Sequence, residues 1–173
     1  KLKVGPYTAG NDVDYGPVVT AAAKANIMKL IETGVAQGAD LVVDGRDFSL
    51  QGYEEGFFVG PHLFDNVTTD MDIYRKEIFG PVLSVVRSES YEAALKMAMD
   101  HEYGNGTAIY TRDGDTARDF AARVNVGMIG INVPIPVPLA YHTFGGWKKS
   151  SFGDLNQHGP DAFRFYTRTK TIT

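Results

Sequence analysis

Apolar residues recur along the chain at two spacings, one typical of helices and the other of short strands. In the N-terminal half, helical spacing predicts a helix over residues 17–37, with Pro17 at its first position and Gly38 at its end. The apolar positions of this helix are Ile27, Met28, Ile31 and Val35. Short apolar runs predict a strand at 39–43 and a strand at 57–64 that is broken by a Gly-Pro pair.

The second half of the chain alternates between the two spacings. Strands are expected at 82–86, 107–110 and 128–133, with helices capped by Ser90 and Asp113 between them. Because short connections join strand, helix, strand, helix and strand, parallel crossovers in one sheet are favoured. The predicted fold class is therefore α/β, with an open, mostly parallel sheet and flanking helices.

Two stretches beyond these strands have unusual patterns. Residues 132–142 contain prolines that alternate with apolar residues, which predicts a stiff loop at the carboxyl end of a strand. Ligands of open α/β sheets bind at such ends, although a rigid structural connector is an equal alternative. Residues 165–173 alternate threonine with other residues and offer no apolar face to a core. We therefore predict that they join the sheet edge of another subunit, forming a homo-oligomer.

Composition narrows the possible functions. The 173 residues are 43% hydrophobic and 22% charged, which indicates a globular chain with a core. A net charge of −4 argues against a nucleic-acid surface, and no apolar run approaches membrane-spanning length. Cysteine is absent, so these residues contain neither a thiolate metal site nor a cysteine nucleophile. The histidines lack metal-ligand spacing, and we expect no metal site; they are His62, His101, His142 and His158.

Residues 77–82 read Glu-Ile-Phe-Gly-Pro-Val and combine an acid, an aromatic ring and a Gly-Pro turn. Gly80 permits backbone conformations closed to other residues, and Pro81 restricts the residue before it to extended geometry. The resulting corner presents Glu77 beside Phe79. This pair suits a ligand with adjacent hydroxyls and a planar ring, such as the ribose and nicotinamide of NAD. The alternative is an ordinary loop before a strand, with a core phenylalanine and a surface glutamate.

Two motifs resemble signatures of the aldehyde dehydrogenase superfamily. Residues 77–82 resemble its EIFGPV signature, and residues 143–148, Thr-Phe-Gly-Gly-Trp-Lys, resemble its PFGGxK block at the usual downstream distance. The resemblance covers nearly the whole chain and corresponds to the C-terminal part of a family member. The run over 131–159 resembles most the CoA-acylating branch, which acts on methylmalonate semialdehyde. Lys76 stands where many members have the first of two acids, so only Glu77 can be matched to that pair.

The resemblance implies roles for four side chains. Glu77 would bind the hydroxyls of the nicotinamide ribose, and Phe79 would pack against the nicotinamide. Phe144 would form a wall of the aldehyde pocket, and His142 lies in the proline-rich loop that would shape the entrance for substrate and CoA. Lys148 and the residue after it are interpreted as a solvated pair, with contact to CoA phosphates as the alternative.

The implied reaction is covalent and uses NAD with coenzyme A as co-substrate. A cysteine thiolate attacks the aldehyde, hydride passes to NAD+, and CoA takes the acyl group with loss of CO2, giving propionyl-CoA or acetyl-CoA. The family's cysteine, oxyanion asparagine, general-base glutamate and NAD-binding domain would precede Lys1. The chain alone is therefore expected to be an inactive fragment. The alternatives are a hydrolytic aldehyde dehydrogenase and a non-catalytic domain that exchanges its terminal strand.

The resemblance also implies a domain division and a compartment. Residues 1–164 would form the C-terminal part of the catalytic domain, and residues 165–173 would form the oligomerisation strand. The partners would be a small aldehyde and CoA, with no nucleic acid and no membrane. The compartment would be the bacterial cytoplasm or, in a eukaryote, the mitochondrial matrix.

Overall fold

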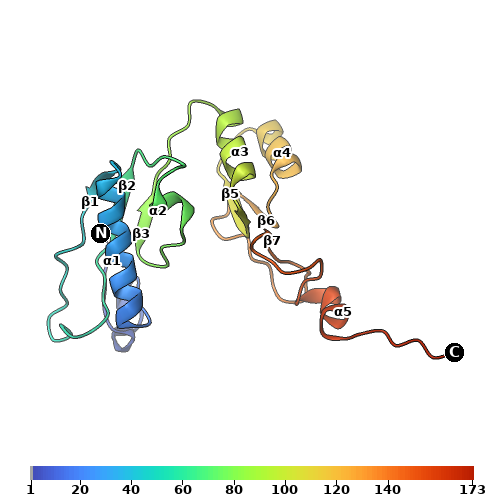
Figure 1. The fold of residues 1–173 in the computed structure, drawn as a ribbon, viewed down its shortest axis with the longest axis horizontal. Helices are drawn as coiled ribbons and strands as arrows, with labels where there is room; N and C mark the ends of the chain where they lie inside the picture. Colours follow the sequence, from blue (N-terminus) through green and yellow to red (C-terminus); the bar gives the residue numbers. More distant parts are fainter. Residues whose placement is uncertain (1) are drawn as a thin grey trace. The chain divides into compact units, whose positions relative to one another are not determined.

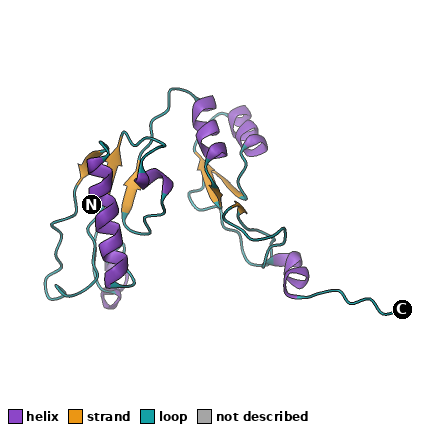
Figure 2. Ribbon diagram, viewed as in Figure 1, coloured by secondary structure: helices purple, strands orange, loops and turns teal. Residues whose placement is uncertain are grey.

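The computed structural model describes residues 2–173, and the chain divides into two compact units between Arg87 and Ser88 (Figure 1). Each unit has its own cluster of buried apolar side chains. Helices and strands are interspersed in both units (Figure 2). Within residues 2–173, no helix has both the length and the apolar character needed to cross a membrane.

The first unit is a small three-stranded sheet with one long helix. Its elements are the 3-10 helix η1 (Tyr7–Asp12), the helices α1 (Ala21–Ala36) and α2 (Asp72–Arg75), and the strands β1 (Asp40–Val43), β2 (His62–Asp65) and β3 (Val82–Ser84). The strand order is β1-β2-β3, with β1 antiparallel to β2 and β2 parallel to β3. His62 of β2 is opposite Val82 of β3, so β2 runs beside the strand that begins at the last residue of the hexapeptide, residues 77–82.

Helix α1 begins at Ala21, and the prediction that Pro17 is its first residue is wrong. The Thr20 hydroxyl accepts a hydrogen bond from the Ala23 backbone N–H at 3.1 Å, which makes Thr20 the N-cap. The other end is as predicted. Gly38 has a φ of 95°, and its N–H donates to the Val35 carbonyl, so this glycine closes the helix in a left-handed conformation.

The core of the first unit lies between α1 and the sheet. Ile27 and Ile31 of α1 and Phe64 of β2 are almost fully buried. Ile73 of α2 also belongs to this cluster, and a Cβ added to Gly34 would lie only 2.8 Å from the Ile73 Cδ1 atom. Gly34 therefore lets α1 and α2 approach closely, as burial of their apolar side chains requires.

The second unit has two short two-stranded sheets and three helices. Its elements are α3 (Tyr91–Asp100), β4 (Tyr103–Gly104), β5 (Gly106–Ile109), α4 (Gly114–Arg123), β6 (Met128–Ile131), β7 (Trp147–Lys148), the 3-10 helix η2 (Gly159–Asp161) and α5 (Ala162–Tyr166). Strands β5 and β6 are parallel and joined through α4, whereas β4 and β7 are antiparallel. Leu95 of α3 and Phe120 of α4 lie in one buried cluster, so the two helices pack together (Figure 1).

The predicted caps of α3 and α4 are confirmed. The Ser90 hydroxyl accepts from the Ala93 N–H at 3.2 Å, and the Asp113 carboxylate accepts from the Thr116 N–H at 2.6 Å. Each cap satisfies a backbone donor that the first helical turn leaves without a partner.

The mixed α/β content is as predicted, but the single, mostly parallel sheet is not. The described residues 2–173 form three separate sheets, and two of their four strand pairings are antiparallel. Strand β3 pairs with β2, although the alternation favoured pairing with β5 through the α3 crossover. The periodicity of apolar residues predicts where strands occur, but it does not specify which strands become neighbours.

The C-terminal segment is partly helical. Phe165 and Tyr166 end α5, so the predicted strand over 165–173 is wrong at its first two residues. Residues 167–173 are exposed and lie in no strand. Joining the sheet of another subunit requires a second chain, so that pairing remains a prediction.

Candidate functional site

The hexapeptide forms a corner in the first unit, and its last residue, Val82, begins β3. Ile78 packs against the core cluster, whereas Glu77 on one side and Phe79 on the other are exposed. The Phe79 side chain is 74% exposed, which excludes the interpretation of this ring as a core phenylalanine. Ile78 thus anchors the corner, and its two neighbours point an acid and an aromatic ring toward solvent.

The backbone of the corner differs from the sequence prediction. Phe79, and not Gly80, has a positive φ, at 57°. A bulky residue in this left-handed region costs about 1–2 kcal/mol, and such strain clusters at ligand sites. Gly80 is needed for a different reason: a Cβ at this position would lie 2.6 Å from the Ile27 Cδ1 atom. After Pro81, the Val82 N–H donates back to the Gly80 carbonyl at 2.8 Å, which closes a tight turn.

A buried histidine lies beside this turn. The backbone N–H of His62 donates to the Pro81 carbonyl at 2.9 Å, and the residue is 3% exposed. Its Nδ1 atom is 2.8 Å from the Gly60 carbonyl oxygen; since that oxygen can only accept, Nδ1 carries the proton. The other nitrogen, Nε2, is buried without a hydrogen-bond partner and lies 3.9 Å from Asp44 Oδ1.

Burial lowers the pKa of His62, although the Gly60 carbonyl and the Asp44 carboxylate partly oppose this effect. Hydrogen bonds from Arg46 lower the pKa of Asp44 to about 2, so this carboxylate stays charged while His62 titrates. The folded state therefore binds a proton on His62 less readily than the unfolded state. Stability from neutral His62 is complete above the ordinary histidine pKa of about 6.5 and is lost as pH falls through the lower folded value.

We expect His62→Asn to reduce the pH dependence of stability, because asparagine can keep the donor to Gly60 but does not titrate. Thermal unfolding followed by circular dichroism at pH 7.5 and 5.5 measures this. The wild-type chain should lose more stability than the variant between these two values. An equal loss in both proteins would show that His62 does not contribute.

Phe144 lies in the second unit, and its ring is half-buried. It stacks on His158, with ring centroids 4.5 Å apart and an interplanar angle of 17°. The two rings line a hollow of about 370 Å³, which also includes the polar side chains of Asn105 and Asn156. His142 does not line this hollow; it is exposed, and its ring lies 4.4 Å from that of Tyr141.

The backbone after Phe144 is tightly confined. A Cβ at Gly127 would lie 2.0 Å from the Gly145 carbonyl oxygen, and a Cβ at Gly146 would lie 2.6 Å from the Ser150 Cβ atom. The next two residues form β7, which pairs with β4 so that Trp147 is opposite Gly104. Glycines here allow the close approach of backbone segments, which a larger residue would prevent.

The interpretation of Lys148 and Lys149 as a solvated pair is wrong for Lys148, which is half-buried, whereas Lys149 is exposed. The Lys148 ammonium donates to three backbone carbonyls at the end of α3, and Lys149 forms an ion pair with Glu102 at 2.5 Å. Sequence reasoning also did not predict the stacking of His158 on Phe144. The sequence does contain a signal for the contacts of Lys148. The last turn of α3 has no basic residue of its own, so a cation from elsewhere can bind its carbonyls.

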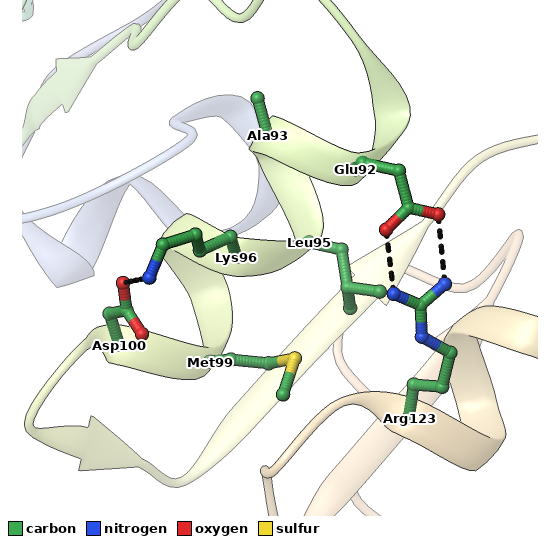
Figure 3. A pocket seen from close by; sticks show the side chains of 7 residues that line it. All are labelled: Glu92, Ala93, Leu95, Lys96, Met99, Asp100 and Arg123. Atoms are coloured by element: carbon green, nitrogen blue, oxygen red, sulfur yellow. Dashed lines mark hydrogen bonds and ion pairs between the residues drawn. The ribbon is translucent and has the colours of Figure 1, made fainter.

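A second hollow of the same unit, of about 480 Å³, lies along α3 (Figure 3). Its charged side chains face one another in pairs: Glu92 with Arg123 at 2.6 Å, and Lys96 with Asp100 at 2.5 Å. Because these charges already have partners, they do not offer free groups to a ligand.

The predicted site residues are divided between the two units. Glu77 and Phe79 belong to the first unit, whereas His142 and Phe144 belong to the second. Among residues 2–173, no group of three or more His, Asp or Glu side chains could hold a metal ion. The roles of the four residues in binding remain predictions.

Comparison with known proteins gives matches along nearly the whole chain. A model of the aldehyde dehydrogenase family matches residues 1–172. The chain is 60% identical over 172 residues to malonate-semialdehyde dehydrogenase from Pseudomonas aeruginosa, covering 99% of this chain and 34% of that protein. It is 47% identical over 160 residues to the mitochondrial acylating methylmalonate-semialdehyde/malonate-semialdehyde dehydrogenase from Bos taurus, covering 92% and 30% respectively.

Solved structures of similar proteins also match nearly the whole chain. The structure of a methylmalonate-semialdehyde dehydrogenase from Sinorhizobium meliloti complexed with NAD has a TM-score of 0.94 and 70% identity, covering 99% of this chain and 35% of that one. A methylmalonate-semialdehyde dehydrogenase from Oceanimonas doudoroffii has a TM-score of 0.93 and 53% identity, covering 99% and 35%. The chain thus spans about a third of the length of these relatives.

Proposed function

Because the chain belongs to the aldehyde dehydrogenase family, we propose that it is the C-terminal part of an NAD-dependent, CoA-acylating semialdehyde dehydrogenase. The proposed substrate is malonate or methylmalonate semialdehyde, and the products are acetyl-CoA or propionyl-CoA with CO2. The observation that carries this proposal is the corner that exposes Glu77 beside Phe79 on a strained backbone. The NAD complex of the Sinorhizobium meliloti relative supports the cofactor.

The corner fits the nicotinamide end of NAD. A carboxylate accepts hydrogen bonds from two adjacent hydroxyls, as on a ribose, and the exposed face of Phe79 offers apolar contact to a flat ring. Ile78 fixes both residues to the core, so little freedom is lost on binding. When bound, NAD would supply the hydride acceptor.

The residues of the second unit fit a role at the aldehyde. Phe144 presents an aromatic wall that stacking on His158 holds in place. The hollow beside it combines apolar and amide side chains, which is the mixture typical of sites for small organic molecules. His142 would contribute from the proline-rich loop at the entrance for substrate and CoA.

The chemistry requires a group that these residues do not contain. The 173 residues include no cysteine, so the nucleophile would come from another part of the enzyme. This chain would then position the cofactor and the substrate. Residues 167–173, which are exposed and in no strand, would join the sheet of a second copy and form the homo-oligomer.

The proposal is tested with the protein encoded by the complete reading frame that contains this chain. With NAD+, CoA and methylmalonate semialdehyde, it should form NADH and propionyl-CoA, which absorbance and mass spectrometry detect. Residues 1–173 expressed alone are the control and should form neither product, because they lack the thiolate. Formation of free acid without a need for CoA would instead support a hydrolytic aldehyde dehydrogenase.

A further inference from the structure

Helix α3 ends at carbonyl groups that its own residues do not satisfy. The last carbonyls of any helix lack partners in the next turn, and they carry partial negative charge. Here the Nζ atom of Lys148 donates to the carbonyl oxygens of Ala98 at 3.2 Å, Met99 at 2.8 Å and His101 at 2.9 Å. An ammonium group has three hydrogens, so these contacts use its whole donor capacity.

The backbone of Lys148 is held as firmly as its side chain. Lys148 is half-buried, and its φ of 54° is rare for a residue with a side chain. It is opposite Tyr103 in the pairing of β4 with β7. Strain of this kind persists only where surrounding contacts fix the conformation, and the three carbonyl contacts supply that restraint.

Only three residues separate Lys148 from Phe144, and the two glycines among them lie close to neighbouring segments. The carbonyl of Gly145 abuts Gly127, and Gly146 lies against Ser150. A change in the position of Lys148 must therefore be transmitted to Phe144.

We infer that Lys148 is a positioning residue that sets the aldehyde-facing wall formed by Phe144, by fixing β7 to the carbonyl end of α3. This inference rests on the proposed function, since it requires Phe144 to contact the aldehyde. It assigns no contact between Lys148 and the substrate. The lysine acts through the short segment that joins it to Phe144.

The test compares two neighbouring lysines in the complete enzyme. Lys148→Met should raise KM for the semialdehyde about tenfold, because small displacements of a substrate-contacting group are costly. Values of kcat and of KM for NAD+ should remain within about twofold, since Glu77 and Phe79 lie in the other unit. Lys149→Met is the matched control, because it removes only an exposed ion pair with Glu102 and should leave KM for the aldehyde unchanged.

A second variant keeps the test decisive. Lys148→Gln retains donors without the charge, and it should raise KM for the semialdehyde by a smaller factor of about three. If Lys148→Met and Lys148→Gln both fold and both have the KM of Lys149→Met for the semialdehyde, the inference is overturned. It is also overturned if neither variant folds, because Lys148 would then be needed only for folding. If Lys148→Met alone does not fold, Lys148→Gln decides in the same way. Failure of the proposed function would differ, because the wild-type enzyme itself would not oxidise the aldehyde.

Discussion

Glu77→Gln in the complete enzyme should raise KM for NAD+ at least about tenfold, because glutamine replaces a charged acceptor for two ribose hydroxyls with a neutral one. KM for the semialdehyde should change little. The corner itself should persist, because Ile78 and Gly80 hold it to the core and the Glu77 side chain is exposed. Initial rates of NADH formation, measured over a range of NAD+ concentrations, give this value.

Glu55→Gln is the matched control for this prediction. Glu55 is also exposed and lies in the first unit, but it is far in sequence from the hexapeptide. The control should have the KM for NAD+ of the wild-type enzyme. If Glu77→Gln also had the wild-type KM for NAD+, the Glu77 carboxylate would have no part in holding the cofactor.

Gly127→Ala should destabilise the second unit by about 3 kcal/mol, through overpacking against a backbone that cannot rotate away. The added methyl would lie 2.0 Å from the Gly145 carbonyl oxygen, so either β6 or the segment after Phe144 must shift. Hydrogen exchange of the β6 amides should accelerate accordingly. The same shift should disturb the stacking of Phe144 on His158.

Gly106→Ala provides the comparison in the same unit. A Cβ at Gly106 would lie 3.6 Å or more from its neighbours, which is ordinary contact. We expect its cost to remain below about 1 kcal/mol. Equal exchange rates in the two variants would mean that the space at Gly127 adapts, and that the segment after Phe144 is less confined than the structure indicates.

Local features of this fold could be predicted from the sequence. Ser90 and Asp113 cap their helices because short polar side chains accept from a free backbone N–H a few residues on, which depends only on nearby residues. Gly38 ends α1 for an equally local reason. Helix α1 shows the limit, because Thr20 competes successfully with Pro17 as the start signal.

Features that depend on distant residues could not be predicted in this way. Strand β3 pairs with β2, because the neighbours of a strand are selected by three-dimensional packing and not by its own pattern. The role of Gly80 arises from the close approach of this corner to Ile27 of α1, and the positive φ of Phe79 has no signal in its residue type. For the site, the residue types at 77 and 79 predict cofactor contacts, and these stay predictions. The contacts of Lys148 with α3 could not be predicted, because they link residues about fifty positions apart.

Trp147 is the only tryptophan of the chain, and it lies in β7, where its side chain is 53% exposed. The first unit contains no indole, since its aromatic residues are phenylalanine and tyrosine. Excitation at the red edge of protein absorbance therefore gives emission from the second unit alone. The chain has a built-in optical label on the strand that carries Lys148, and its emission spectrum reports the surroundings of this strand without any engineered dye.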